Sequence, residues 1–129
     1  MQMTKRMILP LVLLLCTTAL GADKKEITVK LTVPDAAWAI AVDEVHKVGN
    51  ELWVIAILSR NSDLMGAQVI STVQTSLKLA APDLSVKYFV IGKTWDWDNT
   101  EPYTFIRDLK QIEKELKSGK LLYKAPKLD

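Results

Sequence analysis

The sequence predicts a mainly β fold, a small antiparallel β-sandwich of five to six strands with one C-terminal amphipathic helix. Three observations lead to this prediction. Apolar and polar side chains alternate over residues 26–33, two β-rich runs flank Gly49 and Asn50, and the apolar spacing becomes helical in the last third of the chain. The alternation predicts sheets with one buried face, and the late change of period predicts the helix.

The first predicted strand covers residues 26–33. Its apolar members are Ile27, Val29, Leu31 and Val33, and its polar members include Thr28, Lys30 and Thr32. Successive side chains of a strand point to opposite faces, so the apolar set faces a core. Pro34 and Asp35 then form a turn that ends the strand.

Two further strands are predicted to form a hairpin around Gly49 and Asn50. Residues 37–48 place Trp38, Ile40 and Val42 on one face, and residues 52–58 are apolar on both faces. Glycine and asparagine accept the positive φ that a tight hairpin turn requires. The second strand is therefore expected at the centre of its sheet, with Trp53 buried.

The middle of the chain contains two more candidate strands. Residues 67–79 fit either a strand or a helix by spacing, but the segment is rich in β-branched residues. Such residues favour the extended form, so we predict a strand there. Residues 84–91 alternate clearly and form another predicted strand.

The C-terminal third carries one apolar stripe at steps of four, three and four. Its members are Phe105, Leu109, Ile112 and Leu116. We predict a helix that begins at a cap on Thr104 or Asp108 and ends near Gly119, followed by a short strand over residues 120–123. The leading expectation for the topology is an immunoglobulin-like sandwich without its usual disulfide.

The first 21 residues are predicted to be a cleaved export signal. Lys5 and Arg6 precede an apolar run over residues 7–16, and small residues follow before Ala22. The run is shorter than the roughly 20 residues that a membrane-spanning helix needs. We expect an exported single β-rich domain over residues 22–129 with no retained membrane span. A lipoprotein anchored at Cys16 is the alternative.

Charge and cysteine content exclude several classes of function for residues 22–129. Without Lys5 and Arg6, 15 of the 17 basic residues remain against 15 acidic ones, so the net charge is zero. No basic footprint for nucleic acid or an anionic membrane is present. Cys16 is the only cysteine, so a disulfide, a thiolate nucleophile and a cysteine metal site are not expected after cleavage.

The segment between the last clear strand and the helix is the predicted partner-binding site. Its candidate residues are Trp95, Asp96, Trp97, Asp98, Asn99 and Glu101. One of the two indoles is expected to cover the sheet and the other to be exposed. An exposed indole with a polar rim resembles a binding anchor for a protein partner, and the same rings can stack on a sugar. The oxygen-rich side chains do not match the spacing of an EF-hand calcium loop.

His46 is the only histidine and is the one candidate general base. It lies near Asp43 and Glu44, but no serine follows it in a nucleophile context. We therefore expect a solvent-facing hairpin histidine, no catalytic residues and no metal site. A phosphate-binding loop ending at Gly92 is excluded because its first glycine is replaced by Lys87.

These observations favour an exported, non-catalytic binding or accessory module without a cofactor. It would recognise a protein partner outside the cytoplasm through loops on a β scaffold, for example as an inhibitor of an exported hydrolase. Two alternatives remain open, a carbohydrate-binding module that uses Trp95 and Trp97, and a small hydrolase that uses His46 with Asp43 or Glu44.

Overall fold

Strands dominate the part of the chain that the structure describes, residues 24–61 and 68–127 of a computed structural model. Within it 57% of the residues are in strands and 9% in helices, which confirms the mainly β fold. The elements are β1 (Lys24–Val33), β2 (Trp38–Val48), β3 (Glu51–Arg60), β4 (Ser71–Ala80), β5 (Ser85–Ile91), β6 (Thr104–Ile106), the 3₁₀ turn η2 (Leu109–Ile112), α2 (Glu113–Lys117) and β7 (Lys120–Lys124). The predicted strand over residues 67–79 is confirmed as β4.

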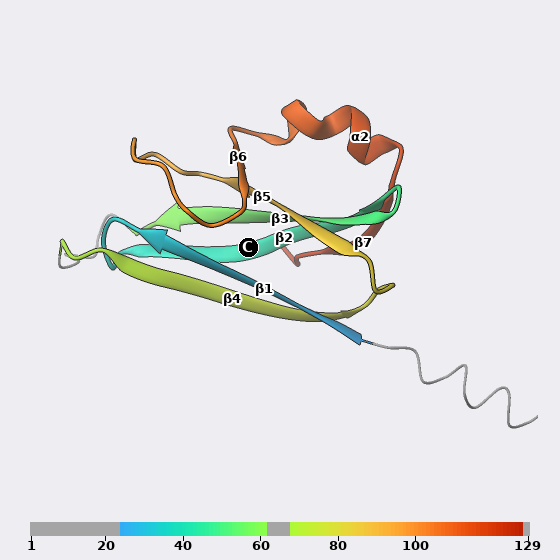
Figure 1. Cartoon of the computed structure of the whole chain (residues 1–129), viewed down its shortest axis with the longest axis horizontal. Coiled ribbons are helices and arrows are strands. Elements are labelled where there is room, and N and C mark those ends of the chain that lie inside the picture. Colours follow the sequence, from blue (N-terminus) through green and yellow to red (C-terminus); the bar gives the residue numbers. More distant parts are fainter. Residues whose placement is uncertain (1–23, 62–67, 128–129) are drawn as a thin grey trace, which may run out of the picture.

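The strands form two sheets that pack face to face (Figure 1). β1 and β4 make an antiparallel pair, and the larger sheet has the order β6-β5-β3-β2-β7. The apolar face of β1 lies on the larger sheet, as its alternation predicted, and Val29, Leu31 and Val33 are fully buried. They pack with Val45, Val54 and other residues of β2 and β3 in one core cluster. The sandwich is therefore held by burial of apolar area between the sheets.

The second face of the larger sheet is covered by η2 and α2 (Figure 1). A smaller cluster there contains Trp53, Ile55, Phe89, Ile106 and Ile112. Trp53 is only 8% exposed, which confirms its predicted burial in a central strand. β3 is apolar on both faces because it is covered on both sides.

The larger sheet is mixed, whereas the sequence predicted purely antiparallel pairing. β3 and β5 are parallel, and so are β5 and β6. The reason is that β4 crosses to the other sheet, so the chain returns to the larger sheet in the direction of β3. Alternation indicates which face of a strand is buried, but it does not indicate which strand is its neighbour.

The helical segment begins at Asp108, the second of the two predicted caps, and ends just before Gly119. The side chain of Asp108 accepts a hydrogen bond from the N–H of Lys110 and begins η2, which leads directly into α2. Phe105, the first member of the predicted stripe, lies in β6 and packs against the core between the sheets. Only the later members of the stripe, such as Ile112 and Leu116, face the second cluster. The predicted strand after Gly119 is confirmed as β7.

A bulge in β2 determines which side chains reach each face of the larger sheet. The β2–β3 register shifts between Val42 and Glu44, so Asp43 is an extra residue without a partner in β3. Val42 and Val45 both face the core between the sheets, although they are three positions apart. Glu44 and His46 consequently lie beside Ile55 and Trp53 on the helix-covered side.

Gly49 has φ of 60°, as predicted for the turn between β2 and β3.

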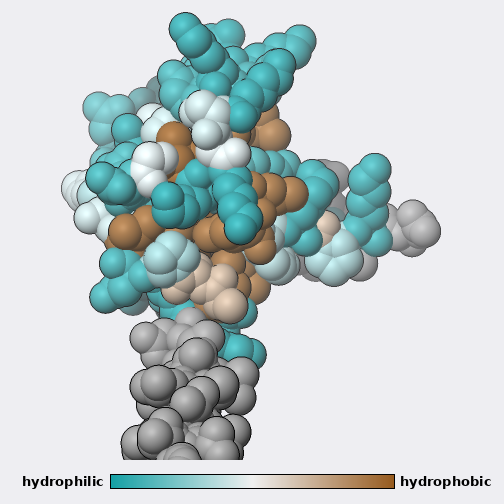
Figure 2. All heavy atoms as spheres, turned by 90° about the vertical axis from the view of Figure 1, so that its right-hand side faces the viewer, coloured by the Kyte–Doolittle hydropathy of each residue, from teal (hydrophilic) through white to brown (hydrophobic). Residues whose placement is uncertain are grey.

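Seen from the right-hand side of Figure 1, hydrophobic side chains reach the surface in a central area bordered by hydrophilic ones (Figure 2). None of the helices in the described residues is long and apolar enough to cross a membrane. The predicted export signal, residues 1–21, and Cys16 lie outside the described residues.

Candidate functional site

The candidate site is the segment of residues 92–103 that connects β5 to β6. It starts at Gly92, whose φ is 110°. A Cβ atom at this position would lie 2.5 Å from the carbonyl oxygen of Leu58, so the turn out of β5 requires glycine. This requirement gives Gly92 a structural role in place of a phosphate-binding one.

The segment then runs along the edge of β1 that faces away from β4. The hydroxyl of Tyr103 accepts a hydrogen bond of 3.0 Å from the backbone N–H of Lys30. One carboxylate oxygen of Glu101 accepts bonds from the N–H of Thr32 at 3.0 Å and from its hydroxyl at 2.8 Å. The amide nitrogen of Asn99 donates to the carbonyl oxygen of Thr32 and to Glu101, both at 2.9 Å. Three loop side chains therefore satisfy backbone groups that a neighbouring strand would otherwise pair.

Glu101 is the charged group of this contact with β1. Burial raises the pKa of its carboxyl, but hydrogen bonds from Asn99 and Thr32 outweigh burial and hold the pKa below its ordinary value of 4.5. Hydrogen bonds to an ionised group are stronger than those between neutral groups. The ionised carboxylate is therefore the form that fixes the loop to β1.

The two tryptophans of the loop stack against each other. The indole N–H of Trp95 donates to the side-chain oxygen of Asn99 at 2.9 Å, and its ring meets Trp38 edge to face at a centroid distance of 5.2 Å. The ring of Trp97 lies 5.4 Å from that of Trp95, tilted by 35°. Both residues are half-buried. The prediction that one ring covers the sheet while the other is exposed is therefore wrong, because residues two positions apart lie on the same side of an extended segment.

The six predicted partner-binding residues thus divide into two groups. Trp95, Asn99 and Glu101 are used in contacts within the chain, whereas Asp96 and Asp98 are exposed and Trp97 is partly exposed. The rings of Trp95 and Trp97 lie against each other at an angle and are not coplanar. Tyr103 was not among the predicted residues, because no local pattern indicates a contact with β1 across 73 positions of the chain.

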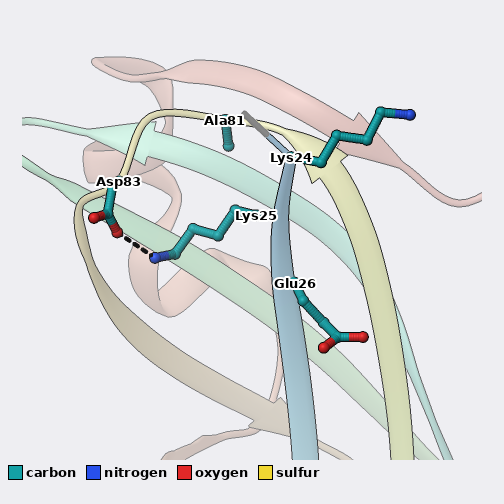
Figure 3. Close-up of a pocket in the computed structure, with 5 residues that line it drawn as sticks. All are labelled: Lys24, Lys25, Glu26, Ala81 and Asp83. Atoms are coloured by element: carbon teal, nitrogen blue, oxygen red, sulfur yellow. Dashed lines mark hydrogen bonds and ion pairs between the residues drawn. The ribbon is translucent and has the colours of Figure 1, made fainter. Parts of the chain in front are cut away.

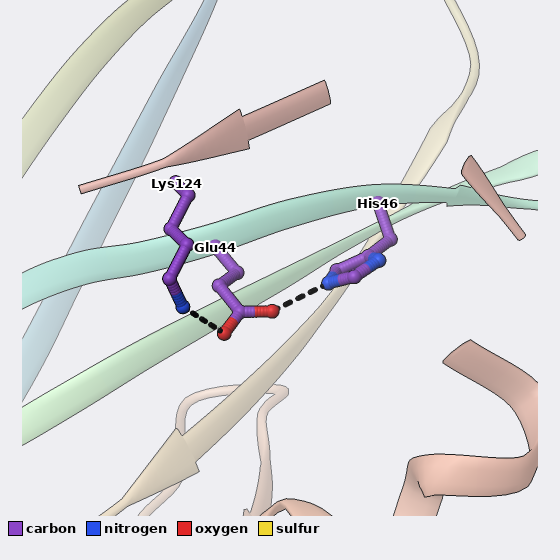
Figure 4. Close-up of polar contacts among 3 residues, drawn as sticks. All are labelled: Glu44, His46 and Lys124. Atoms are coloured by element: carbon purple, nitrogen blue, oxygen red, sulfur yellow. Dashed lines mark hydrogen bonds and ion pairs between the residues drawn. The ribbon is translucent and has the colours of Figure 1, made fainter. Parts of the chain in front are cut away.

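His46 belongs to a second polar cluster, on the helix-covered side of the larger sheet (Figure 4). Its Nε2 lies 2.7 Å from one carboxylate oxygen of Glu44, and the Nζ of Lys124 lies 3.0 Å from the other. His46 is only 8% exposed, so the prediction of a solvent-facing histidine is wrong. His46 is buried because β2 is an interior strand, paired with β3 on one side and with β7 on the other, and because His46 lies beside Trp53 on the helix-covered face of the sheet.

The chemistry of this cluster is limited by its surroundings. Burial raises the pKa of Glu44, but hydrogen bonds from His46 and Lys124 outweigh burial and lower it. A carboxylate that accepts from Nε2 leaves Nδ1 as the second ring nitrogen, and Nδ1 is buried with no hydrogen-bond partner among the described residues. Asp43 is not part of the cluster, and its backbone carbonyl accepts from Ala125. In the described residues no group of three or more His, Cys, Asp or Glu is arranged to hold a metal.

Two cavities lie away from these clusters. One of about 340 Å³ is lined by Lys24, Lys25, Glu26, Ala81 and Asp83, and an ion pair of 2.9 Å joins Lys25 to Asp83 (Figure 3). This bond lowers the pKa of the Asp83 carboxyl. The second, of about 280 Å³, lies beside β4 and is lined by Ala41, Val42, Thr75, Ser76, Leu77, Tyr123, Ala125 and Pro126.

Comparison with known proteins identifies no relative of the chain. No protein-family model, curated protein or solved structure matches the chain.

Proposed function

We propose that the chain is an exported, non-catalytic binding module that recognises a protein partner through residues 95–101. Inhibition of an exported hydrolase is one concrete form of this function. The observation that carries the proposal is the division of the loop into a base bonded to β1 and an outer group that makes no hydrogen bond to β1 within the described residues and contains two exposed aspartates. The outer group consists of Asp96, Trp97 and Asp98.

The base of the loop makes it a pre-ordered binding element. Asn99 and Glu101 bond to Thr32, and Trp95 packs on Trp38, so the base is fixed to the scaffold at several points. A loop that is ordered before it binds loses less conformational entropy on association. Pro102 restricts Glu101 further to extended conformations.

The outer group favours a partner with a basic side chain. Asp96 and Asp98 are exposed on either side of Trp97, whose indole rests on Trp95. An arginine can stack on an indole while its guanidinium pairs with a carboxylate. The expected contact is therefore an Arg or Lys of the partner placed on Trp97 between the two carboxylates.

Capture experiments with matched variants test the role of the loop. The wild-type protein and Trp97→Ala are immobilised, exposed to the exported proteins of the source cells, and the bound proteins are compared by quantitative mass spectrometry. We expect one protein to be captured by the wild type and lost with Trp97→Ala. Thr100→Ala, an exposed neighbour in the same loop, is the control and should keep capture intact.

Charge variants test the expected chemistry of the partner. Asp96→Asn combined with Asp98→Asn should weaken capture, and capture by the wild type should fall as salt is raised. Equal capture by the wild type, Trp97→Ala and the double variant would mean that the loop is not the binding site.

Export is tested separately by the mass of the product. Removal of residues 1–21 gives a protein that begins at Ala22. Mass spectrometry of protein recovered outside the cytoplasm should show this start. A product that begins at a lipid-modified Cys16 would support the lipoprotein alternative, and an intact product confined to the cytoplasm would contradict export.

A further inference from the structure

The two outer edges of the small sheet differ in whether their backbone groups are covered by other residues. The edge of β1 is closed by Asn99, Glu101 and Tyr103, as described above. β4 forms the lower border of the ribbon in Figure 1, and its only strand neighbour among the described residues is β1. The small sheet therefore has one closed edge and one open edge.

The bonds to β1 identify the backbone groups that are exposed along β4. Lys30 and Thr32 direct their N–H groups away from β4, and they lie opposite Gln74 and Thr72 in the register. In an antiparallel pair, residues opposite each other turn their backbone groups the same way, both toward or both away from the partner strand. The N–H and C=O groups of Thr72, Gln74, Ser76 and Lys78 therefore point outward. In the described residues no hydrogen bond reaches these backbone groups.

The larger sheet provides a floor beside this open edge. The 280 Å³ groove is bordered by β4 on one side, by Ala41 and Val42 of β2 below, and by Tyr123, Ala125 and Pro126 at and after the end of β7. β7 is the strand after β2 in the larger sheet, so the end of this sheet borders the groove beside β4. An additional strand beside β4 would lie over this groove.

The sequence of β4 lacks the features that usually protect an edge strand. Residues 71–77 contain no charged residue and no proline, and Lys78 is the only charge of the strand. Val69 and Ile70, just before it, are 61% and 66% exposed. Natural proteins commonly place charges or proline on open edges to prevent pairing between chains. An uncharged, extended edge with apolar residues at its end is suited to pairing.

We propose that the occupant of this edge is β4 of a second copy of the chain, which makes a symmetric dimer with a continuous β1-β4-β4-β1 sheet. Antiparallel pairing centred on Thr75 overlaps the whole of β4. It places Lys78 opposite the second copy's Thr72 and Ile70 opposite the second copy's Ala80. No like charges then face each other, and the exposed apolar residues at one end of each β4 meet small residues at the other.

A proline on the open edge tests the pairing. Gln74→Pro removes an N–H that makes no bond within the chain, and proline is tolerated where the N–H of an edge strand faces outward. We expect the wild-type protein to sediment with the mass of a dimer and Gln74→Pro to sediment as a folded monomer with unchanged circular dichroism. Gln74→Ala keeps the N–H and is the matched control, which should remain dimeric.

Cysteine cross-linking provides a second test that does not depend on the proline variant. Opposite residues at a non-hydrogen-bonded site have Cα atoms about 4.5 Å apart, within the range of a disulfide. In a chain that carries Cys16→Ser, Thr75→Cys should form a disulfide-linked dimer under mild oxidation. Thr28→Cys, on the exposed face of β1, is the control and should stay monomeric under the same conditions.

The outcomes separate this proposal from its alternatives. A wild-type protein that is monomeric at all concentrations tested would overturn it, and so would a dimer that survives Gln74→Pro and does not cross-link through Thr75→Cys. A monomer that binds extended peptides of other proteins at β4 would assign the edge to a different partner. The loop variant Trp97→Ala should leave the dimer intact, so failure of the dimer and failure of the loop proposal are distinguishable.

Discussion

Trp53 and the tryptophans of the loop, Trp95 and Trp97, are held in different ways. Trp53 lies in a central strand, packs on Phe89 at a centroid distance of 4.8 Å and donates its indole N–H to Glu51 at 3.0 Å. Trp95 is positioned by Trp38 and Asn99, and Trp97 by its stack on Trp95. Trp53 thus belongs to a strand in the middle of the larger sheet, whereas Trp95 is held by one distant side chain and one near one, and Trp97 by its neighbour Trp95.

This difference predicts a graded effect of replacing each tryptophan. A ring in the centre of a sheet contributes mainly to stability. A ring at the outside of a fixed loop contributes little to stability and is available for binding. Denaturant titrations of the wild type and of each variant test this gradation, because they give the free energy of unfolding of each protein.

The largest effect is expected for Trp53→Ala. Its ring is buried between the larger sheet and the helical segment, so its removal leaves a cavity in the second cluster. The expected loss is about 3 to 5 kcal/mol, typical of a buried large aromatic residue. An unchanged free energy of unfolding would mean that the helical segment does not cover this face.

Trp95→Ala should have an intermediate effect. It removes the edge-to-face contact with Trp38 and the hydrogen bond to Asn99, which in turn bonds to Thr32. An aromatic pair contributes about 0.5–1.5 kcal/mol and a hydrogen bond a similar amount, so we expect a loss of about 2 kcal/mol. A loss as large as that of Trp53→Ala would show that both rings belong to one continuous core.

Glu101→Gln tests the charge that holds the loop, and its effect should depend on pH. The folded-state pKa of Glu101 is lowered, so its contribution is fully present above the ordinary value of 4.5 and is lost as pH falls through the folded-state pKa. We expect the variant to be less stable by about 1 to 2 kcal/mol at pH 7, because a charged acceptor is replaced by a neutral one.

The same pair of proteins provides its own control for pH. Glu44 and Asp83 also have lowered pKa values, but both proteins contain them, so their effects cancel in the difference. The difference between wild type and Glu101→Gln should therefore shrink steadily below pH 4.5. A difference that stays constant down to pH 2 would contradict the role assigned to the carboxylate.

The smallest effect on stability is expected for Trp97→Ala. Its ring contacts Trp95, and its indole N–H makes no hydrogen bond within the part of the chain that the structure describes. Substitutions of this kind usually stay within about 1 kcal/mol. The loss of partner capture described above should accompany this small change. A loss of 3 kcal/mol or more would mean that Trp97 is a structural residue.

Regular alternation made much of the fold predictable from the sequence. The buried face of β1, the turn at Gly49 and the burial of Trp53 all follow from local patterns and were confirmed. The parallel pairing of β5 with β3 could not be predicted in this way, because it depends on β4 joining the other sheet. Local patterns specify faces, whereas strand order depends on contacts across the chain.

The candidate site was predictable only in its location. The sequence drew attention to residues 95–101, but the bonds of Asn99 and Glu101 to Thr32 link positions almost 70 residues apart. Nothing in the local pattern marks such a contact. The burial of His46 was missed for a related reason, since the local pattern does not show that β7 pairs with β2 beside it.

The bulge at Asp43 also affects which insertions and deletions β2 can accept. Val42 and Val45 are three positions apart, so removing Asp43 would restore regular two-residue spacing and leave each neighbour on its present face. Removing Ala41 or Val45 instead would move the residues on one side of the change to the other face. Deletion of Asp43 has a different cost, because its carbonyl accepts the N–H of Ala125 at 2.8 Å. Shortening β2 at this position would therefore release the segment after β7 that borders the groove beside β4.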